Sequence, residues 1–276
     1  ALCGSRSNKK LKEIEGDIRN LKTVETALQG CNAVIHLACI SNDPSYDLNP
    51  ILGRSINYSS FRPLVLAAKK ADVKRFIFAS SSSVAGSNNN MYFDETQNTD
   101  SPISLYAATK KNNEILAHFY AVNYKIRIIG VRFFTVFGPF GRPDLSIFKF
   151  AYFIKNSKKF FLNNNGNHFR DFTYIDDIVD GIYSLIKKES KKSIPYAIFN
   201  IGNGTPKKLL DYLKHIEKNL NKISKTKKLP LQTGDIVKTH SNINKLKKYT
   251  GYKPKTNIKI GISRFIEWYK EYYRAN

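Results

Sequence analysis

The sequence has few of the residues from which disulfide, zinc or other metal sites are built. The three cysteines, Cys3, Cys31 and Cys39, are odd in number, and their spacings match no zinc-binding pattern. The five histidines likewise show no metal-ligand spacing. We therefore expect the cysteines to be reduced, small apolar residues of a cytoplasmic protein, and we expect no metal ion.

Long apolar runs are also missing. No stretch of about 18 apolar residues occurs, so we expect neither a membrane-spanning helix nor a membrane partner. The first residues, Ala1–Arg6, lack the apolar core that a signal peptide needs. The sequence therefore predicts a protein without a membrane segment.

Acidic residues are scarce, with 22 Asp and Glu against 45 Lys and Arg, so the net charge is +23. Such a charge is typical of nucleic-acid binding, but it is equally typical of a lysine-rich, solvated surface. Pairs such as Lys69–Lys70 and Lys247–Lys248 are scattered along the chain and form no single stripe. We favour the solvated surface, which would steer an anionic small molecule, and we expect no nucleic-acid partner.

Apolar and aromatic residues, in contrast, suffice for a sizeable core, since 42% of the 276 residues are hydrophobic. Apolar runs at 33–38, 75–79 and 126–131 predict buried strands, and the helical period at 50–71 and 105–123 predicts helices between them. This alternation predicts an α/β fold with a Rossmann-like, doubly wound parallel sheet. A ligand of such a sheet lies beyond the carboxyl ends of the strands.

The pattern loosens after about residue 139, where Gly and Pro become frequent. We predict a partial dinucleotide-binding domain at 1–140 and a smaller substrate lobe at 141–276, interleaved with the sheet near 170–202. Lys218–Lys228 is polar and lysine-rich and predicts an exposed linker. The predicted elements of this half are strands at 171–175 and 197–201, and helices at 177–187, 205–220 and 260–273.

Two features carry chemistry, one on a predicted helix and one at the end of a predicted strand. Tyr106 and Lys110 are four residues apart, so a helix places them on one face, where the cation favours the phenolate and makes the phenol a base. Ser80–Ser83 directly follows the strand at 75–79, where its hydroxyls can donate to a sugar oxygen. Taken singly, the first match is also typical of an ordinary helix start and the second of a loop.

Four motifs together resemble the extended short-chain dehydrogenases that act on nucleotide sugars. They are Ala79–Val84, Tyr106-x-x-x-Lys110, Val131–Pro139 and Arg170–Asp177. Tyr106–Asp177, with Gly138–Asp144, is most similar to UDP-glucuronate 4-epimerases. The resemblance implies NAD as cofactor and C4 epimerisation of UDP-glucuronate or a related UDP-sugar. A homodimer is typical of the family.

The resemblance assigns a role to each matching residue. Ser81 matches the serine that binds the sugar hydroxyl, with Ser82 beside it. Tyr106 matches the base that removes the hydroxyl proton, and Lys110 matches the holder of the nicotinamide ribose. The implied cofactor residues are Asp17, Ile18, Leu37, Ala38, Asn57, Tyr106 and Lys110. The implied substrate residues are Ser81, Ser82, Thr135, Arg142, Arg170, Gln232 and Asp235.

Simpler interpretations stay open for four of these residues. Arg142 fits the sugar carboxylate as a bidentate fork, but it could be a surface charge. Arg170 matches a diphosphate contact, but it could pair with Asp171 or Asp176. Asp17 and Thr135 could cap a turn and a strand end.

The family begins with a strand, a Gly-x-x-Gly-x-x-Gly loop and a helix, which this sequence does not contain. We therefore expect the sheet to lack that first unit, whose loop normally binds the dinucleotide pyrophosphate. Three functions compete: a 4-epimerase, another nucleotide-sugar dehydratase or reductase, and a cofactor-deficient, non-catalytic remnant. Dehydratases of the family carry an Asp-Glu pair beside the catalytic hydroxyl, and Ser81–Ser83 offers no such acids.

Overall fold

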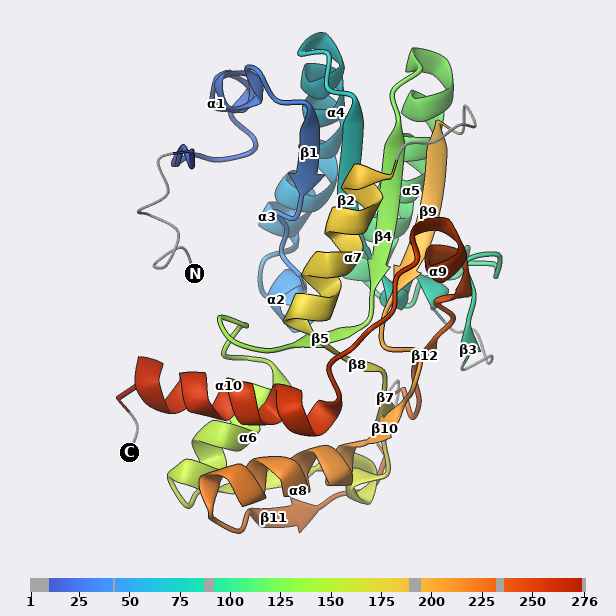
Figure 1. Ribbon diagram of the computed structural model, residues 1–276. Helices are drawn as coiled ribbons and strands as arrows, with labels where there is room; N and C mark the ends of the chain where they lie inside the picture. Colours follow the sequence, from blue (N-terminus) through green and yellow to red (C-terminus); the bar gives the residue numbers. More distant parts are fainter. Residues whose placement is uncertain (1–9, 42, 87–91, 189–194, 232–235, 275–276) are drawn as a thin grey trace. The chain divides into compact units, whose positions relative to one another are not determined.

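The computed structural model describes residues 10–41, 43–86, 92–188, 195–231 and 236–274 (Figure 1). Its contacts separate two compact units. Unit 1 contains Ala1–Asn89, Glu95–Phe133 and Lys188–Phe199, and unit 2 contains Asn90–Asp94, Phe134–Lys187 and Asn200–Asn276. The chain leaves unit 1 at Phe133 and returns to it at Lys188.

Unit 1 is built on a sheet with the strand order β1-β2-β4-β9. Neighbours β1 and β2, and β2 and β4, pair in parallel, with Ile35 opposite Ile77 and Ser80 opposite Arg132. The α/β class with a parallel central sheet is therefore confirmed. The strands are β1 (Ala33–His36), β2 (Arg75–Ser81), β4 (Ile128–Phe133) and β9 (Tyr196–Ile201), whose last two residues belong to unit 2.

Helices α4 and α5 pack against one face of this sheet (Figure 1). The core between them contains Phe61 of α4, Phe76 and Phe78 of β2, and Ala117 of α5, each at most 1% exposed. The predicted helix at 50–71 exists, although a π-helical turn divides it. The helices of unit 1 are α1 (Leu21–Leu28), α2 (Asp43–Leu48), α3 (Pro50–Arg54), the π-helix η1 (Ser55–Ser59), α4 (Phe61–Lys70), the 3-10 helix η2 (Ser82–Ala85) and α5 (Leu105–Tyr124).

Unit 2 has a second core between helices and short two-stranded sheets. Phe172 stacks on Tyr212 with ring centroids 4.1 Å apart, and Phe148 meets Phe265 edge to face. The helices are α6 (Ser146–Lys155), the 3-10 helix η3 (Asn163–Gly166), α7 (Ile175–Lys187), α8 (Leu209–Leu220), α9 (Asn244–Thr250) and α10 (Ile258–Tyr272).

Within the described part of unit 2, the short strands form four pairs. The pairs β5–β8, β11–β6 and β12–β3 are parallel, and β10–β7 is antiparallel. The strands are β3 (Tyr92–Phe93), β5 (Thr135–Phe137), β6 (Lys159–Leu162), β7 (Phe169–Arg170), β8 (Phe172–Tyr174), β10 (Lys207–Lys208), β11 (Lys225–Lys228) and β12 (His240–Ser241).

Two expectations about unit 2 are wrong. Lys218–Lys228 is no linker, because α8 continues to Leu220 and Lys225–Lys228 forms β11 beside β6. The helix expected from residue 205 begins only at Leu209, since Lys207 and Lys208 pair with β7. In both places, main-chain pairing with a strand far away in the sequence determines the secondary structure, although the side chains are polar. No helix in the described part of the chain is both long and apolar enough to cross a membrane.

Candidate active site

Helix α5 presents Tyr106 and Lys110 one turn apart on the same face. The helix begins after Ser104, whose side chain accepts a hydrogen bond from the backbone of Ala107 and so caps the first turn. The Lys110 ammonium lies 5.7 Å from the centroid of the Tyr106 ring. Both residues are buried, with 7% of Tyr106 and 3% of Lys110 exposed. The expected juxtaposition of phenol and cation is therefore present in unit 1.

Lys110 also reaches the carboxyl end of β2. Its Nζ donates to the carbonyl oxygen of Ala79 at 2.8 Å. Two residues further, the Ser81 Oγ accepts from the Ser83 amide at 3.1 Å, a bond that leaves the hydroxyl proton of Ser81 unused. The turn η2 after Ser81 contacts α5. The end of β2 and the first turns of α5 thus bring the predicted serine, tyrosine and lysine to one region of unit 1.

Not every hydroxyl of the serine run serves this region. Ser80 donates its hydroxyl proton to the Glu114 carboxylate at 2.6 Å, and it is only 2% exposed. The expectation that all four hydroxyls can donate to a sugar is therefore wrong for Ser80. Ser82 lies in η2 and is half-buried.

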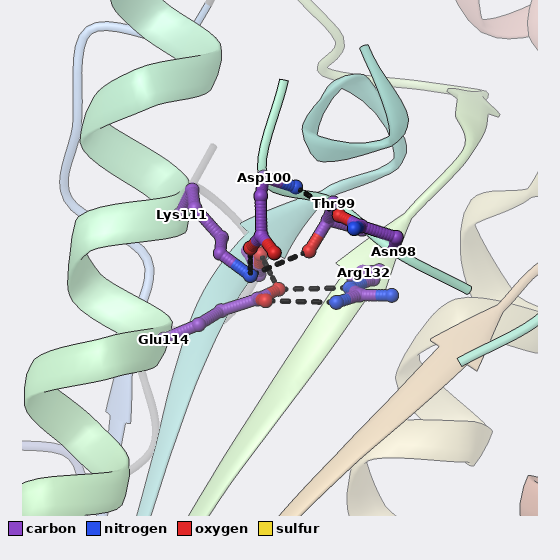
Figure 2. A network of polar contacts seen from close by, with 7 residues as sticks. Asn98, Thr99, Asp100, Lys111, Glu114 and Arg132 are labelled. Carbon is purple, nitrogen blue, oxygen red and sulfur yellow. Dashed lines mark hydrogen bonds and ion pairs between the residues drawn. The ribbon is translucent and has the colours of Figure 1, made fainter. Parts of the chain in front are cut away.

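Glu114 belongs to a polar network that sequence reasoning missed (Figure 2). Arg132 of β4 donates from Nε and Nη2 to the two carboxylate oxygens of Glu114, both at 2.8 Å. Nearby, Lys111 donates to Thr99 at 2.7 Å and lies 3.0 Å from the Asp100 carboxylate (Figure 2). The available signal was the position of Glu114, four residues after Lys110 on the same helix face.

His36 lies at the end of β1, close enough to Lys110 for the charge of that side chain to affect its pKa. Burial, followed by the nearby charge of Lys110, lowers the pKa of His36 from 6.5 to about 4. The ring packs against Phe61 and Phe76, with centroids 6.0 and 6.3 Å away. His36 is therefore neutral at physiological pH, beside the buried ammonium.

The predicted cofactor residues other than Tyr106 and Lys110 lie near the strand ends and turns of unit 1. Leu37 and Ala38 are exposed directly after β1. Asn57 exchanges two hydrogen bonds of 2.8 Å with the backbone of Ile40, so its side chain fixes the segment after β1. Asn57 itself is 2% exposed, which makes it a support of that segment.

Asp17 and Ile18 lie in the turn before α1. The Asp17 carboxylate accepts from Arg19, with its Oδ1 2.9 Å from the Arg19 Nε. Side-chain and backbone hydrogen bonds from Arg19 lower the pKa of Asp17 to about 2. Ile18 lines a cavity of about 160 Å³ together with residues of α1, η1 and α4.

Unit 2 brings Thr135 and Arg170 to one cavity of about 260 Å³. Thr135 begins β5, and its amide donates to the Asp171 carbonyl oxygen at 3.2 Å. The Arg170 Nη1 donates to the carbonyl oxygens of Phe169 at 3.0 Å and Val237 at 3.2 Å. Two predicted substrate residues that are far apart in the sequence therefore line the same cavity.

Other predicted substrate residues are not in this cavity. Arg142 lies 3.1 Å from the Asp144 carboxylate, and both side chains are partly exposed. Its surface pairing matches the simpler interpretation, while its role toward a substrate stays a prediction. Gln232 and Asp235 lie outside the described residues.

The cavity of Thr135 and Arg170 also contains residues that sequence reasoning missed. Phe161 of β6 is 61% exposed and lines it, as do Asn163, His168 and Ser146. An aromatic ring beside a guanidinium offers a stacking face together with a positive charge. Burial alternates along β6, and Phe161 occupies one of its exposed positions. An aromatic residue at such a position was the available signal for a binding role.

Asp171, next to Arg170, links separate segments of unit 2. Its fully buried carboxylate accepts from the Asn203 amide at 2.7 Å, the Gly204 amide at 3.0 Å and the Ser241 hydroxyl at 2.6 Å. These bonds leave Asp171 engaged with the backbone, so it holds β8, β12 and the loop after β9 together. Within the described ranges, no three His, Cys, Asp or Glu side chains are placed to hold a metal ion.

Comparison with known proteins gives the context of this geometry. Residues 3–202 match the model of the NAD dependent epimerase/dehydratase family. An uncharacterised protein of Methanocaldococcus jannaschii is 48% identical over 204 residues, which cover 74% of this chain and 61% of that protein. The chain thus spans less than two thirds of this archaeal relative.

Two further relatives have an assigned activity. A probable UDP-glucuronate 4-epimerase of Rhizobium meliloti is 36% identical over 257 residues, covering 87% of this chain and 75% of that protein. The crystal structure of the UDP-glucuronic acid 4-epimerase of Bacillus cereus in complex with NAD superposes with a TM-score of 0.88 at 28% identity. That superposition covers 100% of this chain and 84% of the other.

Proposed function

The chain belongs to the NAD-dependent epimerase/dehydratase family, and we propose that it inverts C4 of a UDP-sugar, with UDP-glucuronate as the preferred substrate. The observation that carries this proposal is the arrangement of Tyr106 and Lys110 on α5 at the carboxyl end of β2. The relatives named as UDP-glucuronate 4-epimerases support the choice of substrate.

The residues present fit NAD in unit 1. The exposed Leu37 and Ala38 follow β1, which is where a Rossmann-like sheet receives its dinucleotide. Asn57 fixes the backbone next to them, and the Lys110 ammonium offers a donor to a ribose hydroxyl. Asp17 and Ile18 would hold the adenine end. NAD held by these residues would supply the hydride acceptor and donor for C4 of the sugar.

The protein's own residues carry the proton chemistry. Ser81 donates its hydroxyl proton to the oxygen on C4 and orients it, while Tyr106 removes the proton of that hydroxyl. Lys110 stabilises the resulting phenolate with its positive charge. Because all three are buried or nearly so, water is kept from the oxygen that gains and loses the proton.

Residues of unit 2 would hold the rest of the substrate. Arg170 suits the diphosphate, and the exposed ring of Phe161 in the same cavity suits the nucleobase. Arg142 and Thr135 would bind the carboxylate of the sugar, with Arg142 exchanging Asp144 for the substrate. Gln232 and Asp235 are proposed for the nucleotide end through the family resemblance.

Besides the substrate, we propose a second copy of the chain as partner, so that the protein forms a homodimer. Ile115, Phe119 and Val122 on α5 are 55%, 50% and 40% exposed and recur at helical spacing. Such an apolar stripe on one helix suits a contact with a second copy of the chain.

The direct test incubates the purified chain with UDP-glucuronate and NAD and follows the sugar H4 signal by proton NMR. Epimerisation gives UDP-galacturonate, whose axial 4-hydroxyl changes the H3–H4 coupling. Failure to form it with saturating NAD would refute the proposal. A product lighter by one water would indicate a dehydratase instead.

A further inference from the structure

The pair of Glu114 and Arg132 has no role in the chemistry proposed above, yet it lies beside it. The two side chains are only 5% and 8% exposed. Arg132 binds the carboxylate with two parallel hydrogen bonds of 2.8 Å, a bidentate geometry. A charged pair of this kind is thus enclosed in unit 1.

Stability is a poor explanation for such a pair. Removing two charges from water costs several kcal/mol per ion, and a well-packed apolar pair of similar size is often as stable. Burial alone would lower the pKa of Arg132, but hydrogen bonds and charge from Glu114 outweigh it and raise the pKa overall. Arg132 therefore stays charged, and its fork fixes the pair in one geometry.

The pair connects three elements at one point. Arg132 of β4 lies directly opposite Ser80 of β2 in the sheet register, and Ser80 donates to the same carboxylate at 2.6 Å. Glu114 of α5 therefore binds both neighbouring strands at once (Figure 2). A shift of α5 along the sheet would break all three hydrogen bonds together.

The connection lies next to the proposed chemistry. Ser80 directly precedes Ser81, and Glu114 lies one helical turn after Lys110, which itself donates to Ala79. Tyr106, Lys110 and Glu114 thus occupy successive turns on one face of α5. Two of the three bind consecutive residues of β2, so the position of α5 sets where the phenol lies relative to the Ser81 hydroxyl.

We propose that Glu114 and Arg132 are positioning residues, which lock α5 to the ends of β2 and β4 and thereby align Tyr106 with Ser81 for proton transfer. This inference rests on the proposed function. Misalignment of reacting groups by about 1 Å costs about 100-fold in rate, and contacts away from the reacting atoms can produce it. A fork of this kind is suited to hold such an alignment.

The test variant is Glu114→Gln combined with Arg132→Met, which removes both charges and leaves neither ion unpaired. The matched control is Val73→Ala. Val73 is a core residue of unit 1 just before β2, at the end of the strand away from Ser80 and Ser81, and its truncation opens a cavity there. Melting temperatures are measured first, and each protein is then compared at the same interval below its own transition. Arg132→Lys is a second variant, which keeps the charge and loses the fork.

Two readouts separate positioning from stability. In steady-state epimerisation, we expect kcat of the double variant to fall about 30- to 100-fold while KM changes less than about threefold. Arg132→Lys shows the same kind of loss, and Val73→Ala keeps kcat within about twofold. In amide hydrogen exchange, segments 79–83 and 105–110 of the double variant exchange at least about tenfold faster than in Val73→Ala.

The outcomes distinguish the two proposals. An unchanged kcat in an active double variant, or unchanged exchange in these segments, overturns the positioning role and leaves the epimerase proposal intact. If the wild-type chain shows no epimerisation, the proposed function fails, and the exchange experiment still decides whether the pair locks α5 to β2.

Discussion

The Lys110 Nζ donates to the carbonyl oxygen of Ala79 at 2.8 Å, so the ammonium on α5 is fixed at the end of β2. The same ammonium lies 5.7 Å from the Tyr106 ring centroid. The fold itself thus sets the position of the Lys110 side chain relative to Tyr106 and β2.

Replacing Lys110 by Met therefore removes a fixed cation from the neighbourhood of Tyr106. We expect kcat for epimerisation to fall at least about 100-fold, because the phenolate loses its stabilising charge. The neighbouring Lys111→Met is the control, since Lys111 is engaged with Thr99 and Asp100. It should retain kcat within about threefold, and equal losses in both variants would contradict the assignment.

The lowered pKa of His36 predicts a pH dependence of stability. The unfolded chain binds a proton on His36 near pH 6.5, whereas the folded protein binds it only near pH 4. Between these values the unfolded state holds more protons, so the free energy of unfolding rises with pH by about 1.4 kcal/mol per unit from this group. This stability is fully present above pH 6.5 and is lost as the pH falls toward 4.

Urea titrations of the wild type and His36→Phe between pH 4 and 7.5 measure this slope. Phenylalanine suits the site, because the ring already packs against Phe61 and Phe76. The variant should show the flatter pH dependence. Parallel curves for the two proteins would show that His36 does not carry the effect.

Gly86, which follows η2 at the end of the serine run, should not tolerate a side chain. Its φ is +58°, and a Cβ there would lie 1.9 Å from the Ser101 carbonyl oxygen. Gly30 is the matched control, with φ of +72° and no atom within 4 Å of the added Cβ. We expect Gly30→Ala to cost about 1 kcal/mol of unfolding free energy and Gly86→Ala about 2 kcal/mol more, measured by urea unfolding. Equal costs would refute the steric argument.

Arg142 should determine the preference for a uronic acid. Its guanidinium already binds the Asp144 carboxylate at 3.1 Å, and the substrate carboxylate would take that place. For Arg142→Ala we expect KM for UDP-glucuronate to rise at least about tenfold, with KM for UDP-glucose changing less than about threefold. A similar rise for both substrates would assign Arg142 to another part of the site.

Residue pattern predicted the local elements well, and it predicted their long-range pairing poorly. The period of apolar residues placed the strands of the central sheet and the helix that carries Tyr106, because burial of one face fixes that period. The strand at Lys225–Lys228 escaped prediction, since its stability comes from main-chain pairing with β6 and its side chains are polar. For the same reason, the helix predicted to begin at residue 205 begins at Leu209, after two residues that pair with a strand.

The candidate site shows the same division. Tyr106 and Lys110 were found because their spacing on one helix already implies a shared face. Arg132 was missed, because its link to Glu114 depends on how β4 lies beside β2 and α5. Ser80 was assigned to the sugar for a similar reason: only the packed structure shows that its hydroxyl donates a hydrogen bond to Glu114.

The central claim is that Tyr106 moves the proton of the sugar hydroxyl. Tyr106→Phe retains the buried ring on α5 and loses only the phenolic oxygen. The decisive measurement is the epimerisation rate of UDP-glucuronate by this variant at saturating NAD, beside its melting temperature. Our account predicts a rate at least about 1,000-fold below that of the wild type, with an unchanged melting temperature. A rate within a few-fold of the wild type would contradict it.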